Sequence, residues 1–354
     1  MKQPTGEHRP GYLVLRTSGV LPEISVRLIK RTVLVCALLL CACLFLAVIC
    51  LGIGDYPISP DETLAVLFGG GSPQAQLVVV EWRIPRVALA LLLGFALGLS
   101  GAVFQSLTRN PLGSPDIIGF STGSYTGGLI AILVLGGGYL TTAAGAVLGG
   151  LATAVVVYLL AYRNGVQGFR LIIVGIGVSA TLASVNTWLI TRAHLDDAMQ
   201  AAIWGSGSLN GLGYEQLWPV LALLAVCVPV LAAHAPALRQ LELGDDRAAA
   251  SGTRIELARL SAMLWGIILV AICTAAAGPI AFIALVAPQI ARRLCASASI
   301  SLFPAALTGC FLLLLSDLAA QRIFAPVQLP VGVMTVTLGG VYFVWLLIRE
   351  RRTS

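Results

Sequence analysis

The sequence is poor in charge. Asp, Glu, Lys and Arg make up 11% of its 354 residues, whereas hydrophobic residues make up 58% and the mean hydropathy is +0.92. Soluble domains carry about 25% charged residues, so most of this surface is expected to contact lipid. The net charge of +6 does not indicate nucleic acid binding. Lys and Arg gather in the N-terminal tail and at the ends of apolar segments, where they act as topology signals and interfacial anchors.

Residues that catalyse reactions or bind metals are also scarce. The three histidines, His8, His194 and His234, lie far apart, and no Cys-x-x-Cys pair occurs. A Walker A motif (Gly-x4-Gly-Lys-Ser/Thr) is absent, so the chain is not expected to bind and hydrolyse ATP through one. No cluster of His, Asp or Glu lies within the apolar segments. The sequence therefore predicts neither an enzyme nor a metal site, and no cofactor bound by this chain.

Long apolar runs dominate the sequence instead. A bilayer crossing needs about twenty apolar residues, and the sequence predicts an all-α, polytopic membrane protein with ten crossings. The first is interpreted as a retained helix, because a cleaved signal peptide would not follow so long a polar tail. Pro279 and Pro288 bracket the eighth, which is barely long enough to cross. The predicted segments are 33–53, 86–106, 117–136, 141–161, 170–191, 216–236, 259–277, 279–294, 303–321 and 331–348.

The basic residues predict the orientation of these segments. If all ten cross, most Lys and Arg of the short connections fall on one side, which the positive-inside rule identifies as cytoplasmic. Both termini are then cytoplasmic, with tails at 1–32 and 350–354 around a transmembrane domain at 33–349. Three arginines break the pattern and are predicted outside: Arg83, Arg86 and Arg322.

One polar stretch separates two strongly apolar segments. Residues 109–116 read Arg-Asn-Pro-Leu-Gly-Ser-Pro-Asp, and their backbone amides would lack partners in hydrocarbon. The stretch must lie inside protein, at a water-filled cavity or at the cytoplasmic surface. A plain helix-helix turn is the alternative, but the length and the two prolines favour a packed elbow that lines a transport path.

Two connections are predicted to have structure of their own. A short outer helix is expected within 196–210, beginning at a carboxylate and ending in a glycine-rich turn. Residues 238–259 form the long cytoplasmic connection, in which Gly244 and Gly252 are predicted to separate two short surface helices. Apolar residues such as Leu241 and Leu243 need a surface to bury against, so a partner protein is expected there.

Several motifs together resemble the FecCD-type permeases of bacterial ABC importers, which carry ferric siderophores, haem or cobalamin. The likeness runs from about residue 30 to the C-terminus, and Arg163-Asn164-Gly165 and the 204–212 stretch are most similar to subunits of the ferric-enterobactin type. The motifs are Arg83-Ile84-Pro85-Arg86, Ser100-Gly101-Ala102-Val103-Phe104-Gln105, the 109–116 stretch, the 277–288 stretch and Leu329-Pro330-Val331-Gly332-Val333.

The resemblance implies an assembly. Two permease subunits, expected here to be paralogues on the ferric-enterobactin pattern, would surround one path. Two cytoplasmic ATPase subunits would hold the ATP and Mg²⁺, and a siderophore-binding protein would dock outside. Transport would follow alternating access, and membrane lipid would cover the remaining surface.

The resemblance also implies roles for individual residues. Arg83 and Arg86 match arginines that receive the binding protein, while the third such position falls on Gln321, with Arg322 one place later. The implied cytoplasmic gate comprises Asn110, Leu112, Gly168 and Phe169. The implied ATPase coupling loop, 238–259, includes Leu241, Leu243, Gly244, Asp245, Asp246 and Gly252.

An ion-coupled secondary transporter is the rival from another class. Such a protein needs ionisable groups near the membrane midplane. Only Asp116 and Asp317 are candidates, and both lie close to predicted segment ends. Within the preferred class, cobalamin or haem is the alternative cargo.

Overall fold

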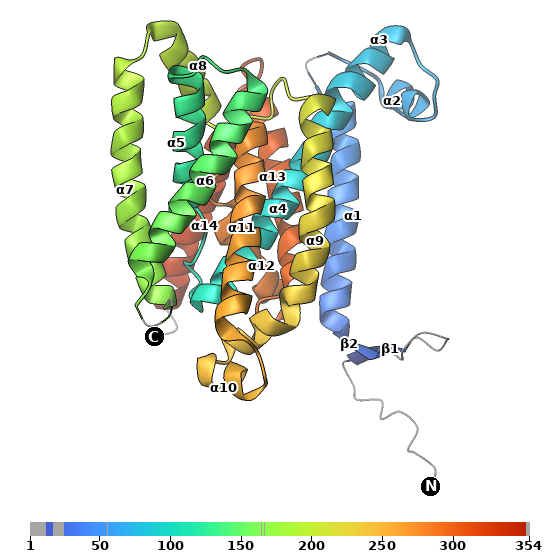
Figure 1. Cartoon of the computed structure of the whole chain (residues 1–354). Helices are drawn as coiled ribbons and strands as arrows, with labels where there is room; N and C mark the ends of the chain where they lie inside the picture. Colours follow the sequence, from blue (N-terminus) through green and yellow to red (C-terminus); the bar gives the residue numbers. More distant parts are fainter. Residues whose placement is uncertain (1–11, 17–24, 55, 164, 166, 352–354) are drawn as a thin grey trace.

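A computed structural model describes residues 12–16, 25–54, 56–163, 165 and 167–351 of the chain. Helices form nearly all of it, which confirms the predicted fold class (Figure 1). The helices are α1 (Lys30–Gly52), α2 (Pro60–Leu67), α3 (Pro73–Gln76), the π-helix η1 (Leu77–Arg83), α4 (Ile84–Thr108), α5 (Phe120–Leu133), α6 (Tyr139–Ala161), α7 (Gly168–Arg192), α8 (Leu195–Gly205), α9 (Tyr214–Glu242), α10 (Asp245–Ala250), α11 (Ile255–Ala277), α12 (Ile283–Cys295), α13 (Leu302–Arg322) and α14 (Val331–Arg351).

A helix lies at each of the ten predicted segments, but they are not ten equal crossings. Seven helical runs among the described residues are long and apolar enough to span: α1, the run Pro73–Thr108, α6, α7, α9, α11 and α13. With 14 and 13 residues, α5 and α12 reach only about 20 Å, short of the roughly 30 Å hydrocarbon core. The expectation of full-length helices there is wrong, because non-helical backbone at 109–119 and 278–282 precedes them.

The first 32 residues are not wholly irregular. β1 (Tyr12–Arg16) and β2 (Ser25–Ile29) pair antiparallel ahead of α1. This hairpin corrects the all-α expectation locally. Other parts of the predicted tail lie outside the described residues.

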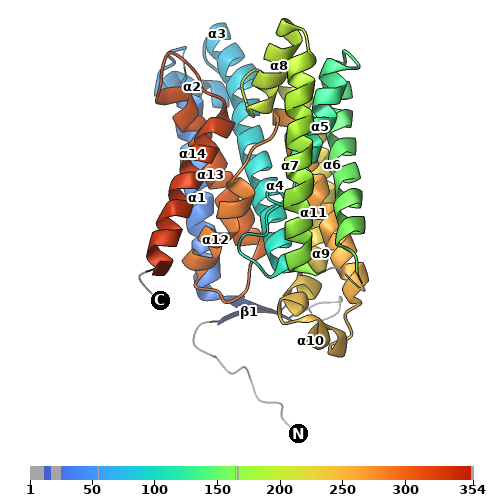
Figure 2. The same cartoon turned by 90° about the vertical axis from the view of Figure 1, so that its left-hand side faces the viewer.

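α4 lies at the centre of the bundle, with α13, α11, α12 and α9 around it (Figure 2). Its glycines permit close contact with its neighbours. An added Cβ at Gly94 would lie 2.4 Å from the backbone oxygen of Gly309, and one at Gly101 only 1.8 Å from that of Ala284. Small residues at helix crossings are how membrane helices pack without a hydrophobic driving force.

The two ends of the bundle carry different structures. α1 begins and α14 ends at the end where α10 lies, whereas α2, α3 and α8 lie at the opposite end (Figure 1). α8 overlaps the predicted outer helix at 196–210, with Asp196 and Asp197 in its first turn.

In the long connection at 238–259, the prediction of two short helices is wrong. α9 continues through Glu242, and a single short helix, α10, lies between the positive-φ residues Gly244 and Gly252.

Candidate functional site: the elbow and the α10 loop

The 109–119 segment, here called the elbow, connects α4 to α5. Arg109 ends α4 in the left-handed conformation, at φ 52°, which non-glycine residues adopt rarely. The side chain of Asn110 then accepts a hydrogen bond from the N–H of Leu112 at 2.9 Å, closing a local turn of the kind Asn favours. The chain thus leaves α4 abruptly and in a defined direction.

The elbow runs inward along α7. Added Cβ atoms at Gly168 and Gly175 would lie 2.6 Å from Thr108 Cα and from Ile118 O, respectively. Gly175 is seven residues into α7, so α5 begins about 10 Å inside the bundle from the start of α7. From Gly113 onward the elbow therefore lies mostly within protein, as the sequence predicts from its polar amides, whereas its first residues, Arg109 to Leu112, are more exposed.

The structure brings together the four residues predicted to form a gate. Asn110 and Leu112 follow the end of α4, and Gly168 and Phe169 begin α7, which touches that end at Thr108. The side chains of Leu112 and Phe169 are 40% and 72% exposed in the single subunit. Their role as a gate stays a prediction.

Asp116 connects the elbow to the break before α12. One carboxylate oxygen accepts a hydrogen bond from Ser121 Oγ at 2.5 Å, and the other accepts one from the N–H of Phe282 at 3.2 Å. Phe282 has a φ of 70°, so a strained residue is held where the helical path is broken. The carboxylate has a structural task in this conformation, which weakens its candidacy as an ion-coupling site.

A second carboxylate, Asp245, connects the elbow to the loop that contains α10. Oδ1 of Asp245 lies 2.8 Å from a guanidinium nitrogen of Arg109 and 3.0 Å from one of Arg259. Arg109 is the first residue of the elbow, while Arg259 lies in the first turns of α11 and is 7% exposed. Asp245 thus contacts two separate elements from the first position of α10.

Other residues of the predicted coupling loop surround this cluster. Leu241 is buried, whereas Leu243 is 63% exposed, as expected for a side chain awaiting a partner. Ser106 on α4 donates a hydrogen bond of 2.5 Å to Glu242 at the end of α9. An open hollow of about 670 Å³ is lined by Arg109, Leu243, Gly244, Asp245, Asp246 and Arg247.

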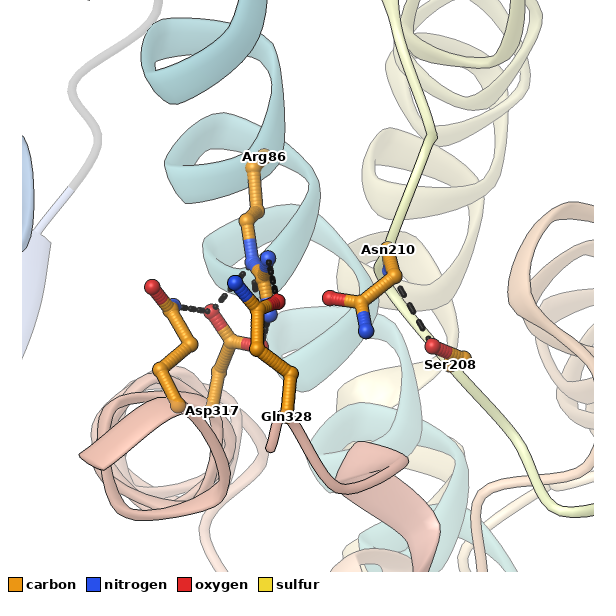
Figure 3. Close-up of polar contacts among 6 residues, drawn as sticks. Arg86, Ser208, Asn210, Asp317 and Gln328 are labelled. Atoms are coloured by element: carbon orange, nitrogen blue, oxygen red, sulfur yellow. Dashed lines mark hydrogen bonds and ion pairs between the residues drawn. The ribbon is translucent and has the colours of Figure 1, made fainter. Parts of the chain in front are cut away.

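At the opposite end of the bundle, Arg86 is bound within the subunit (Figure 3). Its guanidinium pairs with Asp317 of α13 at 2.9 Å and donates to Gln328 Oε1 at 3.2 Å. Asp317 is 1% exposed and also accepts a hydrogen bond from Gln321. Such a pair is both charge-assisted and nearly desolvated. The ion pair therefore joins α4 to α13 and to the connection before α14.

Arg83 is also bound within the subunit. It is 8% exposed and donates hydrogen bonds to the backbone oxygens of Leu51 and Tyr56, the former at 2.8 Å. It therefore satisfies carbonyls at and beyond the C-terminal end of α1. The docking role predicted for Arg83 and Arg86 is untested by these contacts and stays a prediction.

The sequence did not reveal the partners of these charges. Asp245 lies 136 residues from Arg109, and Asp317 lies 231 residues from Arg86. The available signal was chemical: an arginine and an aspartate at apolar segment ends need opposite charges nearby.

Among the described residues, no group of three or more His, Cys, Asp or Glu could hold a metal ion.

Comparison with known proteins decides the family. A profile of the FecCD transport family matches residues 26–349. The chain belongs to this family. It is 48% identical over 323 residues to the ferric enterobactin transport system permease protein FepG of Escherichia coli, covering 91% of this chain and 98% of that protein. It is 36% identical over 310 residues to the iron(3+)-hydroxamate permease FhuG of Bacillus subtilis, covering 85% and 92%.

A solved structure agrees with the fold. An inward-facing metal-chelate type ABC transporter superposes with a TM-score of 0.78 at 28% identity, covering 89% of this chain and 99% of the other. The protein is thus a multi-pass membrane permease, a transport component rather than an enzyme. The resemblance found in the sequence motifs is confirmed.

Proposed function

We propose that this chain is one of two permease subunits of an ATP-driven importer that carries a ferric siderophore across the bacterial inner membrane. An enterobactin-like catecholate is the favoured cargo, since the 48% identity to FepG extends over 98% of that protein. The second permease is a paralogue. Two cytoplasmic ATPases bind ATP and Mg²⁺, and a binding protein docks at the outer end, where Arg83 and Arg86 lie.

In this assembly, the end of the bundle with α10 and both chain ends faces the cytoplasm. The exposed Leu243 and the hollow beside it receive a surface of the ATPase. A polar loop with one outward apolar side chain suits such a contact, because burying that side chain adds to the interface while the loop charges stay at its rim.

The observation that carries the coupling mechanism is the position of Asp245 between Arg109 and Arg259. When ATP-driven closure of the ATPases displaces α10, Asp245 transmits the displacement to Arg109, the first residue of the elbow. The elbow holds Asn110 and Leu112, and Thr108, the residue just before it, packs against Gly168 at the start of α7. One movement therefore reaches both predicted gate segments through direct contacts.

Replacing Asp245 with Asn tests this mechanism in the reconstituted importer. Loss of the carboxylate charge should lower uptake of a radiolabelled ferric catecholate several-fold, while the ATPase still co-purifies with the permeases. Asp246→Asn is the matched control, because Asp246 lines the same hollow but lies outside the Arg109–Asp245–Arg259 cluster. Its uptake should fall less than that of Asp245→Asn, and an equal fall would assign the effect to the ATPase-facing hollow and not to the cluster.

Three results would separate the parts of this proposal. Unchanged uptake in Asp245→Asn would contradict the coupling route. Loss of ATPase binding would instead identify Asp245 as part of the ATPase contact. Competition of uptake by excess ferric hydroxamate, but not by a ferric catecholate, would contradict the proposed cargo.

A further inference from the structure

The connection between α1 and α4 carries an exposed apolar surface, defined here as the α2 patch: Leu64, Leu67 and Phe68. Their side chains are 50%, 43% and 89% exposed. Leu67 and Phe68 come three and four residues after Leu64, so both lie on the side of α2 that carries Leu64, with Phe68 as the residue that caps the helix. An unpartnered apolar surface of this kind needs an occupant.

The opposite side of α2 is already packed. Val66 is buried in a small cluster with Ala75, Val78 and Val79 of α3 and η1. Along the long axis of the bundle, α3 lies farther than α2 from its middle (Figures 1 and 2). Because α2 packs against α3 and η1 through Val66, the patch on its other side is turned away from them.

The length of α1 places α2 at the membrane surface. α1 contains 23 residues, or about 34 Å of helix, which matches a hydrocarbon core of roughly 30 Å. Its outward side chains, including Leu38, Phe45 and Val48, are 55–70% exposed and need lipid around them. α2 lies beside the outer end of this lipid-facing helix (Figure 1).

Two further exposed aromatic residues lie near the outer end of α1, one in the connection after α1 and one in η1. The backbone oxygen of Tyr56 accepts a hydrogen bond from Arg83. Arg83 also donates a hydrogen bond to the backbone oxygen of Leu51 at the end of α1. Trp82 precedes Arg83 in η1. The side chains of Tyr56 and Trp82 are 49% and 59% exposed. Aromatic side chains gather at the height of the lipid headgroups, and α2 contacts both α1 and η1, the helix that carries Trp82.

We infer that the α2 patch inserts into the outer headgroup layer of the membrane and that α2 is an interfacial helix. Short amphipathic helices bind bilayers in this way, with the apolar side at the acyl boundary. The inserted helix anchors η1 and the start of α4, and hence Arg83 and Arg86, at a defined height above the membrane. The occupant is phospholipid rather than a binding protein or the second permease.

A photo-crosslinking phenylalanine derivative at position 68 tests the inference without removing the native cysteines. The assembled importer would carry it in nanodiscs of phosphatidylethanolamine and phosphatidylglycerol. Irradiation should give adducts that carry the mass of one phospholipid, several-fold more abundant than from the same derivative at Gln74. Gln74 is the control because it is exposed and polar and lies on α3, farther out.

Addition of the binding protein distinguishes the alternatives. Phospholipid adducts at position 68 should persist in its presence. Crosslinks from position 68 to the binding protein or to the second permease would overturn the inference in favour of a protein contact. Equal lipid labelling at positions 68 and 74, or no lipid adduct at position 68, would overturn it in favour of a surface in water.

Discussion

α4 and α7 have the same length, 25 residues each, yet they occupy opposite environments. In an apolar stretch of 18 consecutive residues within the run that contains α4, 78% of the residues are buried, against 17% in the corresponding stretch of α7. The difference lies in which residues repeat along each helix. α4 presents small residues to backbone on neighbouring helices, whereas α7 leaves one side uncovered by the rest of the described chain.

The uncovered side of α7 is not purely apolar. Thr181, Ser184, Thr187 and Thr191 lie along it, exposed, and their hydroxyls donate to backbone oxygens one turn earlier. Hydroxyls satisfied in this way tolerate lipid, but a repeated polar stripe suits a partner helix or a hydrated path better. α4 therefore organises the subunit, whereas α7 is the helix that we expect to face the proposed second permease or the cargo.

The largest change in stability is expected when the ion pair between Arg86 on α4 and Asp317 on α13 is broken. Replacing Arg86 with Gln leaves Asp317, which is 1% exposed, without its guanidinium. Removing one partner of a buried ion pair typically costs about 3–5 kcal/mol. A large fall in the melting temperature of the purified subunit is expected. Arg192→Gln, at the exposed end of α7, should leave it nearly unchanged.

The double variant Arg86→Gln/Asp317→Asn sharpens this prediction. With both charges removed, part of the lost stability should return, because no uncompensated charge stays buried. A double variant no more stable than the single one would mean that Arg86 stabilises the subunit by packing or through Gln328, and not through the ion pair.

A smaller effect is expected from adding one methyl group to each helix. Gly101→Ala on α4 would place a Cβ 1.8 Å from Ala284 O, so backbone must shift, at a cost of about 1–3 kcal/mol. Gly177→Ala on α7 meets nothing within 4 Å and should raise stability by about 1 kcal/mol through helix propensity. Thermal unfolding in detergent measures both. Equal effects would refute the contrast between the helices.

The smallest effect on stability is expected from altering the exposed side of α7. The variant Thr181→Leu/Ser184→Leu should change the stability of the isolated subunit by no more than about 0.5 kcal/mol, as surface changes do. Assembly with the second permease, measured by co-purification, or uptake of cargo should nevertheless fall. If neither falls, α7 faces lipid.

Much of the fold was predictable because each membrane helix is a contiguous apolar run that can be recognised in the sequence. Positions of all ten helices follow from apolar runs, and the break at 109–116 follows from polar amides that lipid cannot satisfy. The shortness of α5 and α12 was not predictable in this way. The apolar pattern of a run such as 117–136 predicts one crossing in either case: when the run is entirely helical, and when it begins as an elbow packed against α7.

The segments of the candidate site could be predicted from the sequence, but the contacts between them could not. The family motifs pointed to Asn110, Gly168 and the 238–259 loop, since each lies in a matching stretch. The Arg109–Asp245–Arg259 cluster was not foreseen, because ion pairs between residues more than a hundred positions apart leave no local pattern. The extension of α9 through Glu242 was missed for a related reason: tertiary packing outweighs the propensity that suggests a separate helix.

The sequence by itself determined that this is a membrane protein, where its long apolar helices lie and which family it belongs to, because burial in lipid requires long apolar runs and the family motifs are contiguous. Only the tertiary structure decided which helix is central, which arginines are bound within the subunit and which carboxylate joins the elbow to α10. Those outcomes depend on close approach between distant segments, where a glycine permits contact and a buried charge must find an opposite one.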